Sequence, residues 1–232
     1  MDSRTLILDT IRKALSDVDK TKLSEPEMPV IWERQGLSKA EMAETFVNNL
    51  RAVAGEAIIC ADAKAAVEEI SKSLRELARH SQNSDSHQLG VYRSELTDSI
   101  LDDIKACLQD WSLVFAPENP DADPKIYEPM TASLVSPFLL LADTGSCAIE
   151  AQNPFDRFLC YLSPACLILA KASQLREHLP DAWNEIEAKM KNPNQRGEIA
   201  LVTGPSRTAD IEKKLVLGVH GPQKLLVFII ND

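Results

Sequence analysis

The sequence predicts an α/β fold: a layered parallel or mixed sheet flanked by helices, with an N-terminal helical extension. From residue 57 onward, short apolar runs alternate with amphipathic helical patterns, which is typical of parallel strands joined by crossover helices. The runs are apolar nearly throughout rather than at every second position, as strands covered on both faces are. Together the two observations favour one layered domain.

The first residues are expected to lie outside that domain. Apolar residues recur at helical spacing between residues 5 and 15, which predicts an amphipathic helix. Residues 16–37 are polar and are interrupted by proline and glycine, so they are expected to form a surface connection. We therefore expect an N-terminal helix and linker over residues 1–37 and an α/β domain over residues 38–232.

The first half of the domain alternates helices with strands. Ser38 and Glu41 have the spacing of a capping box, which predicts a helix that runs from there to Gly55. Strands are expected at residues 57–60, 89–92 and 113–115, and helices at about 62–77 and 97–108.

The second half carries most of the glycines and the remaining strands. Residues 117–129 are rich in proline and aspartate and are expected to form a loop, and residues 153–157 are expected in another. Strands are expected at residues 137–141, 147–150, 166–169, 199–203 and 225–230, and helices at residues 175–190 and about 208–217.

Composition excludes several classes of protein. The net charge of −10 would repel a nucleic-acid backbone, and no dense basic run offsets it. The longest apolar stretches, such as residues 137–142, are far shorter than the roughly 20 residues that cross a bilayer. The first residues contain no apolar signal-peptide core. We expect a cytoplasmic protein with no nucleic-acid partner and no membrane span.

Cysteine and histidine usage gives no cofactor site. The five cysteines are widely spaced, none forms a Cys-x-x-Cys pair, and the four histidines are scattered. A zinc or iron–sulfur ligand motif is therefore lacking, and the sequence leaves any other cofactor unknown. The cysteines are expected to be reduced and mostly buried, because a free cysteine behaves as a small apolar residue.

The segment Thr203–Asp210 is the first candidate binding site. It joins an expected strand to an expected helix, and free backbone amides at a helix start attract anions. An arginine there could add a bidentate contact to a carboxylate or phosphate. The same polar side chains could instead only cap the helix. The ligand-binding candidates in this segment are Gly204, Ser206, Arg207, Thr208 and Asp210.

Three other places offer further candidates. Asp143, Thr144 and Gly145 form a turn between apolar runs, Arg157 lies in an expected loop, and His220 lies in a glycine-rich turn. Asp143 and His220 are the candidate acid–base residues, whereas the other three are candidate ligand-binding residues. Turn geometry, a solvated arginine and a surface histidine are the structural alternatives.

These motifs resemble a known family. Residues 203–212, followed by residues 218–222, closely resemble the C-terminal signature of lactate-utilisation protein C, a LUD-domain family. The turn at residues 143–146 is similar to the Glu-Thr-Gly-Thr turn of that family. The usual Gly-Ala-Asp before the apolar strand is replaced here by Ser136-Pro137-Phe138. The resemblance covers most of the chain.

The resemblance implies both a fold and a role. The fold would be like that of ribose-phosphate isomerases, CoA transferases and formyltetrahydrofolate cyclo-ligases, with a site near the strand ends. The role would be to oxidise L-lactate to pyruvate with separate iron–sulfur subunits as partners and a small carboxylate such as lactate as ligand. Two alternatives stay open: a stand-alone enzyme acting on a sugar phosphate, CoA ester or folate, and a non-catalytic scaffold.

Overall fold

The chain divides into two compact units, Met1–Glu33 and Arg34–Asp232. The computed structural model describes residues 3–16, 33–80, 87–117, 123, 125, 130–191, 198–208, 216–218 and 221–232. In the first unit, α1 (Ser3–Ser16) is an amphipathic helix with no buried residue. The domain boundary expected at residue 37 stays a prediction.

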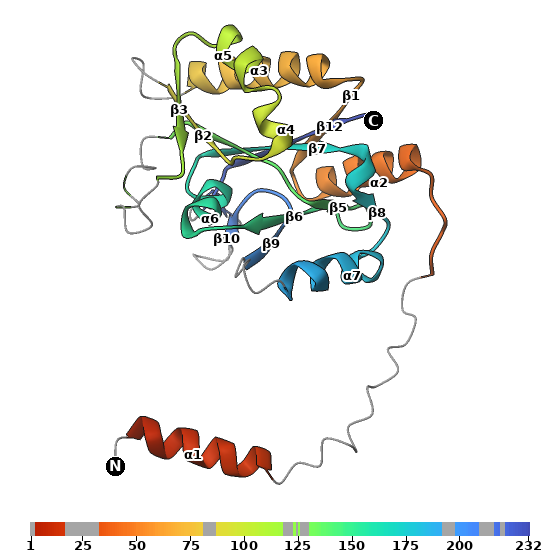
Figure 1. The fold of residues 1–232 in the computed structure, drawn as a ribbon. Coiled ribbons are helices and arrows are strands. Elements are labelled where there is room, and N and C mark those ends of the chain that lie inside the picture. Colours follow the sequence, from red (N-terminus) through yellow and green to blue (C-terminus); the bar gives the residue numbers. More distant parts are fainter. Residues whose placement is uncertain are drawn as a thin grey trace. The chain divides into compact units, whose positions relative to one another are not determined.

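The second unit is built on a six-stranded sheet in which every neighbouring pair of strands is parallel (Figure 1). In spatial order the strands are β1 (Glu56–Cys60), β12 (Lys224–Ile230), β7 (Ala165–Lys171), β4 (Ala132–Val135), β2 (His87–Val91) and β3 (Trp111–Phe115). The predicted parallel sheet is confirmed.

A second, mixed sheet has four strands. Its order is β8 (Leu175–Arg176), β5 (Leu139–Leu141), β6 (Ser146–Ala151) and β9 (Glu198–Val202). β6 pairs antiparallel with both β5 and β9, whereas β8 pairs parallel with β5. A short antiparallel pair, β10 (Arg207–Thr208) and β11 (Val216–Leu217), follows β9 in the chain.

Alternate residues of the central strands face two separate cores. In β7, Leu167 belongs to a core shared with α3 (Ala63–His80) and α5 (Leu101–Cys107), whereas its neighbour Ile168 belongs to the core on the other face. Successive side chains of a strand point to opposite faces, so a strand covered on both sides is apolar throughout. This explains the continuous apolar runs in the sequence.

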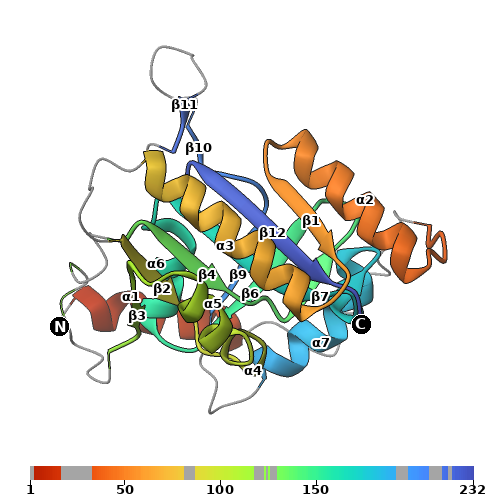
Figure 2. The ribbon, with the colours of Figure 1, turned by 90° about the horizontal axis from the view of Figure 1, so that it is seen from above.

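The layers can be followed in Figures 1 and 2. α3 and α5 cover one face of the parallel sheet, and α2 (Lys39–Ala52), α6 (Pro154–Tyr161) and the mixed sheet cover the other. α7 (Leu179–Met190) packs on the far face of the mixed sheet. The short helix α4 (Glu95–Asp98) and the 3-10 turn η3 (Ala172–Gln174) lie beside the ends of strands.

The capping box predicted for α2 is present. The Ser38 hydroxyl accepts the backbone N–H of Glu41 at 3.3 Å, and the Glu41 carboxylate accepts the backbone N–H of Ser38 at 2.8 Å. Two of the unpaired amides at the helix start are satisfied by these bonds.

The loop predicted at residues 153–157 is wrong, because α6 begins at Pro154. The Asn153 side chain accepts the backbone N–H groups of Phe155 and Asp156, and proline is favoured at a first helical position. Asn-Pro is typical of both turns and helix starts, so the pair alone did not separate the two.

Other boundaries differ from the prediction. The helix expected over residues 208–217 is wrong at its two ends, since Thr208 pairs with Val216 in β10 and β11; its interior lies outside the described residues. The helix expected from residue 175 begins at 179, because Leu175 and Arg176 pair with β5. The helix expected over residues 97–108 is divided into α4 and α5 at Ser99, whose hydroxyl donates to the Leu96 carbonyl.

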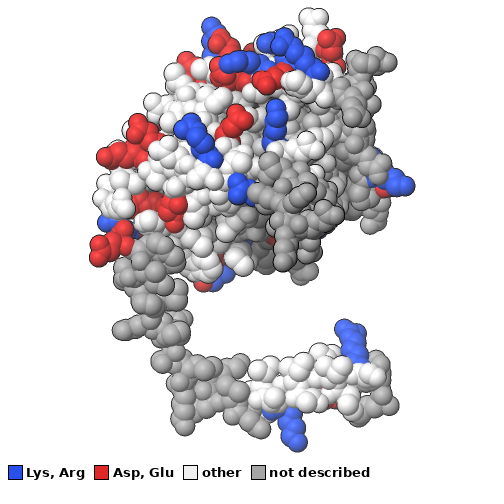
Figure 3. All heavy atoms as spheres, turned by 180° about the vertical axis from the view of Figure 1, so that it is seen from behind, with Lys and Arg blue, Asp and Glu red and all other residues white. Residues whose placement is uncertain are grey.

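Charged side chains are intermixed on the face drawn in Figure 3. Lysine and arginine lie beside aspartate and glutamate there, and the described residues form no continuous basic area on that face. None of the helices in the described parts of the chain combines the length and the apolar composition that crossing a bilayer requires.

Candidate functional site

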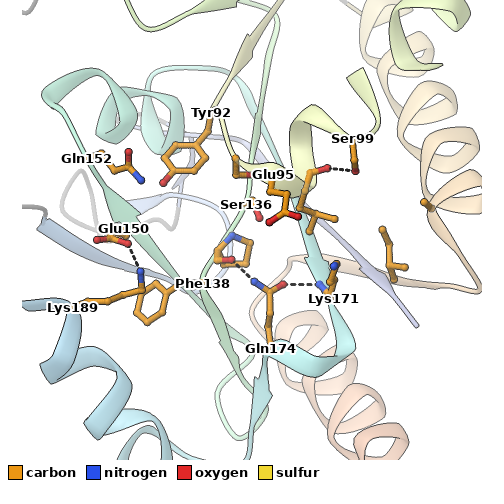
Figure 4. A pocket seen from close by; sticks show the side chains of 15 residues that line it. Tyr92, Glu95, Ser99, Ser136, Phe138, Glu150, Gln152, Lys171, Gln174 and Lys189 are labelled. Carbon is orange, nitrogen blue, oxygen red and sulfur yellow. Dashed lines mark hydrogen bonds and ion pairs between the residues drawn. The ribbon is translucent and has the colours of Figure 1, made fainter. Parts of the chain in front are cut away.

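A cavity of about 560 Å³ lies at the carboxyl ends of the parallel strands (Figure 4). Tyr92 follows β2, Ser136 follows β4, Lys171 ends β7 and Ile230 ends β12. Open parallel sheets bind ligands beyond the carboxyl ends of their strands, and the volume lies within the roughly 300–1,000 Å³ of small-molecule pockets. This cavity is the best candidate for a functional site in the described residues.

The mixed sheet and two helices complete the cavity wall. Phe138, Glu150 and Gln152 come from β5, β6 and their flanks, Lys189 comes from α7, and Glu95 comes from α4. The cavity is also lined by four residues that carry hydroxyl groups: Tyr92, Ser94, Ser99 and Ser136. The cavity is therefore rich in hydrogen-bonding groups and carries charge of both signs.

The Glu150 carboxylate and the Lys189 ammonium form an ion pair in this wall. The Glu150 side chain is 7% exposed, and its Oε2 accepts a hydrogen bond from Lys189 Nζ. That nitrogen also lies 5.1 Å from the centre of the Phe138 ring, within cation–π range. A carboxylate buried to this degree needs such a partner, because an unpaired buried charge is costly.

Tyr92 contributes a hydroxyl that keeps its proton. Burial, together with the nearby carboxylates of Asp156 and Glu150, raises the pKa of Tyr92 to about 12. The phenol therefore stays neutral through the physiological pH range and can both donate and accept a hydrogen bond.

Gln174 positions the opposite side of the cavity. Its Oε1 accepts the backbone N–H of Lys171 at 2.6 Å, and its Nε2 donates to the Pro137 carbonyl at 2.6 Å. These bonds tie the end of β7 to the entry of β5. Lys171 is exposed, and its charge helps to lower the pKa of the Asp232 carboxyl. Its ammonium group forms no ion pair within 4 Å with a carboxylate of the described residues, so it can receive an anion.

The structure brings two of the sequence motifs together, but away from this cavity. The turn Asp143–Gly145 joins β5 to β6 at the end of β6 that is opposite to Glu150. Ser146 and Thr203 lie with their hydroxyl oxygens 2.6 Å apart. Gly204, which follows Thr203, packs against Val53 at the end of α2.

Asp143 lines a smaller pocket of about 240 Å³, together with Glu177 and His178. His178 Nδ1 lies 3.2 Å from Asp143 Oδ2, although neither ring nitrogen has the geometry of a hydrogen bond to a described residue. Asp143 thus lies beside His178. No sequence signal pointed to His178, because 35 residues separate the two partners along the chain.

The remaining predicted site residues are dispersed. Arg157 lies on α6 and forms an ion pair with Glu198 at the start of β9. The backbone of Ser206 bonds the Pro222 carbonyl and the Gly218 amide, each at 2.9 Å. Arg207 is exposed on β10.

Thr208, also on β10, pairs with Val216, and Thr144 accepts a hydrogen bond from Ser146 at 2.8 Å. Asp210 and His220 lie outside the described residues. Of the predicted site residues that the structure describes, none lines the strand-end cavity. A signal for the cavity residues did exist, since Tyr92, Ser136 and Lys171 each end or directly follow an apolar run.

A metal site is not found in the described residues: no three of their histidine, cysteine, aspartate and glutamate side chains are arranged to hold an ion. All five cysteines are free, and four of them are buried, as the sequence predicts.

The layers and the strand-end cavity place the chain among α/β proteins whose parallel sheet carries its pocket at the carboxyl ends of the strands. Within that class the match is specific: the LUD domain family profile covers residues 43–230. The chain belongs to the LUD domain family.

Relatives with curated names point the same way. The chain is 33% identical over 93 residues to lactate utilization protein C of Macrococcus caseolyticus, covering 40% of each chain. It is 28% identical over 109 residues to lactate utilization protein C of Bacillus pumilus, covering 47% of this chain and 45% of that one. The aligned part is thus less than half the length of either relative.

A solved structure supports the fold alone. The crystal structure of a DUF162 family protein from Deinococcus radiodurans is 14% identical, with a TM-score of 0.57, and the match covers 84% of this chain and 99% of that chain.

Proposed function

We propose that this chain is a subunit of a cytoplasmic L-lactate utilisation system, which oxidises lactate to pyruvate together with separate iron–sulfur subunits. The names of the relatives and the LUD domain match support the lactate role. The proposal that other subunits carry the iron–sulfur clusters is supported by the sequence, which has no Cys-x-x-Cys pair for such a cluster.

The proposal that the chain binds lactate is supported mainly by Lys171, which lines the strand-end cavity. Its ammonium group forms no ion pair within 4 Å with a described carboxylate, although it helps to lower the pKa of the Asp232 carboxyl. It lies at the edge of the sheet where parallel α/β proteins bind ligands. A lactate carboxylate would pair with Lys171, and the lactate hydroxyl would bond to the serine hydroxyls on the same side of the cavity.

A calorimetric titration of the full-length protein with L-lactate tests this part. Lys171→Met should weaken lactate binding by at least about tenfold, because a hydrogen bond to a charged group is lost. Lys224→Met is the matched control, since Lys224 is an exposed lysine at the amino end of the same sheet. Equal binding by both variants, or no lactate binding by the unmodified protein, would contradict a lactate site here.

The partner part of the proposal rests on Arg207. This arginine is exposed on β10, which stands off the two sheets with β11 in Figure 2. We propose that residues Gly204–Asp210 contact a partner subunit, with Arg207 pairing with a carboxylate. Arg157 is a further candidate for a partner contact, and His220, which lies outside the described residues, is proposed for the same role. Asp143, Thr144 and Gly145 would support the pocket beside His178.

Co-purification with iron–sulfur subunits tests the partner surface. Arg207→Ala should reduce recovery of the complex, whereas Arg79→Ala, which removes an exposed arginine from the end of α3, should not. If the unmodified chain does not associate with such subunits, the assembly is rejected whatever the cavity binds.

A further inference from the structure

We propose that the strand-end cavity takes a 2-hydroxy acid longer than lactate, with one carboxylate and a chain of several hydroxyl groups. That the ligand is a 2-hydroxy acid rests on the proposed function, whereas the length of the ligand and its hydroxyl groups are inferred from the cavity.

The size of the cavity exceeds what lactate would fill. Its volume of about 560 Å³ is in the range that holds drug-sized ligands, whereas lactate is a three-carbon acid. Figure 4 shows Lys171 and Lys189 at opposite sides of the space, with Phe138 and Gln174 between them. A ligand bound to Lys171 that also reaches the Glu150–Lys189 side must therefore be longer than lactate.

The two sides of the cavity differ in what they can bind. Lys171 forms no ion pair within 4 Å with a described carboxylate, although its charge also acts on Asp232, and it suits an anion. On the other side the Glu150 carboxylate already holds Lys189 through Oε2, so that lysine is largely neutralised. Glu95 is a further carboxylate of the wall, and it lies beside Ser136 rather than beside Glu150 in Figure 4.

Carboxylates accept hydrogen bonds from hydroxyl groups and repel other carboxylates. Glu150 therefore favours a ligand whose far end carries hydroxyl groups, and it disfavours a second carboxylate at that end. Tyr92 and Ser136 add neutral hydroxyls that can bond the same groups. The Phe138 ring offers an apolar surface for the C–H groups of the ligand chain.

Calorimetry on the full-length protein tests the length. D-Gluconate, a six-carbon 2-hydroxy acid, should bind at least about tenfold more tightly than L-lactate, because it can add contacts on the Glu150 side. Equal or weaker binding of gluconate overturns the inference. Tighter binding of D-glucose 6-phosphate than of gluconate overturns the carboxylate head group in favour of a phosphate.

Variants on the Glu150 side separate the two ends. Glu150→Gln should weaken gluconate binding by about tenfold and change lactate binding by less than about twofold. Tyr92→Phe removes a single oxygen and should act in the same direction without disturbing the ion pair. Tyr161→Phe is its control, since Tyr161 is an exposed tyrosine at the end of α6 that does not line the cavity.

The binding results for lactate and gluconate test this inference separately from the proposed function. Lactate binding that depends on Lys171, without tighter gluconate binding, overturns the longer ligand and leaves lactate standing. Gluconate binding that depends on Lys171 and Tyr92, without lactate binding, supports the longer ligand and contradicts lactate as the substrate. A loss of gluconate affinity that Tyr161→Phe reproduces would overturn the assignment to the Glu150 side.

Discussion

Ser146 Oγ and Thr203 Oγ1 lie 2.6 Å apart, although the two residues are 57 positions apart in the sequence. This contact holds the turn before β6 against the turn after β9. Both turns contain a glycine with a positive φ angle, 64° at Gly145 and 82° at Gly204. Both glycines also pack against the end of α2. The two sequence motifs are thus joined in one structural contact.

The first prediction concerns the close approach at Gly145. A Cβ atom there would lie 2.5 Å from the backbone nitrogen of Leu50, so Gly145→Ala should destabilise the fold by about 2–4 kcal/mol, through backbone strain plus displacement of α2. Urea unfolding measures the change. Gly36→Ala is a matched control, because Gly36 has a similar φ of 67° but nothing within 4 Å of its Cβ position.

The Gly36 variant isolates the cost of the φ angle, about 1 kcal/mol. Equal losses for Gly36→Ala and Gly145→Ala would mean that α2 moves away without resistance, which contradicts a tight contact.

The second prediction concerns the pH dependence of the segment that leads into α2. The Glu177 carboxylate accepts the backbone N–H of Leu37, and it accepts that of Gln35 at 2.9 Å. The bond from Leu37, followed by that from Gln35, holds the pKa of Glu177 below its ordinary value of 4.5 despite partial desolvation.

A carboxylate with a lower pKa in the folded state stabilises the fold above its unfolded pKa, and that contribution is lost as the pH falls through the folded value. Glu177→Gln should therefore lower the melting temperature at pH 7 and reduce its fall below pH 4.5. Glu76→Gln, an exposed glutamate of α3, serves as the control. Identical pH profiles for the unmodified protein and the Glu177 variant would rule out this contribution.

Local signals explain the parts of the fold that the sequence predicts well. The capping box of Ser38 and Glu41 lies within four consecutive residues, and the parallel strands appear as apolar runs because both of their faces are buried. Neither feature depends on contacts that are distant in the sequence.

β4 was not predicted, because the hydrogen-bond partners of its one polar side chain are distant in the sequence. Ser133 interrupts its apolar run, and the buried hydroxyl finds partners in the Leu159 carbonyl and the Ser163 hydroxyl. The segment Arg207–Leu217 was misassigned at its ends for a related reason. Its spacing fits a helix, whereas the pairing of Arg207 with Leu217 is a tertiary outcome.

The candidate cavity was predicted only in its location near strand ends. Its walls come from both sheets and α7, and the Glu150–Lys189 pair joins residues that are 39 positions apart. Periodicity cannot show which of several charged residues meet. Ser136, Pro137 and Phe138, where the sequence departs from the family pattern, all line the cavity. That departure and the ends of the apolar runs were the sequence features that coincided with the site.

The third prediction concerns thiol reactivity. Cys107 is exposed, whereas Cys60, Cys147, Cys160 and Cys166 are buried. Burial raises the pKa of Cys60 to about 11 and that of Cys166 to about 12, and it raises those of the other two buried thiols as well. Since the thiolate is the reactive form, only Cys107 should react quickly with iodoacetamide at pH 8.

Mass spectrometry of the alkylated protein checks this prediction. Cys107→Ser should remove the fast modification, Cys60→Ser should leave it unchanged, and full unfolding should expose all remaining thiols. Fast labelling of Cys160 or Cys166 in the folded protein would contradict the buried core between β7, α6 and β4.

The last prediction concerns the stability of the Glu150–Lys189 pair. Lys189→Met leaves the Glu150 carboxylate 7% exposed without its cation, and breaking a buried pair typically costs about 3–5 kcal/mol. Lys189 is partly exposed, at 32%, so water can replace some of the interaction and a loss of about 2–3 kcal/mol is expected.

Lys191→Met is a close control, because Lys191 pairs with Glu187 on the surface of the helix end and such pairs contribute about 0–1 kcal/mol. The double variant Glu150→Gln with Lys189→Met should recover part of the loss, since no charge is then left unpaired. A Lys189→Met variant no less stable than Lys191→Met would show that Glu150 reaches water without Lys189. The far side of the cavity would then be an open anionic surface rather than a neutral hydrogen-bonding wall, and it would lose its selectivity for hydroxyl groups.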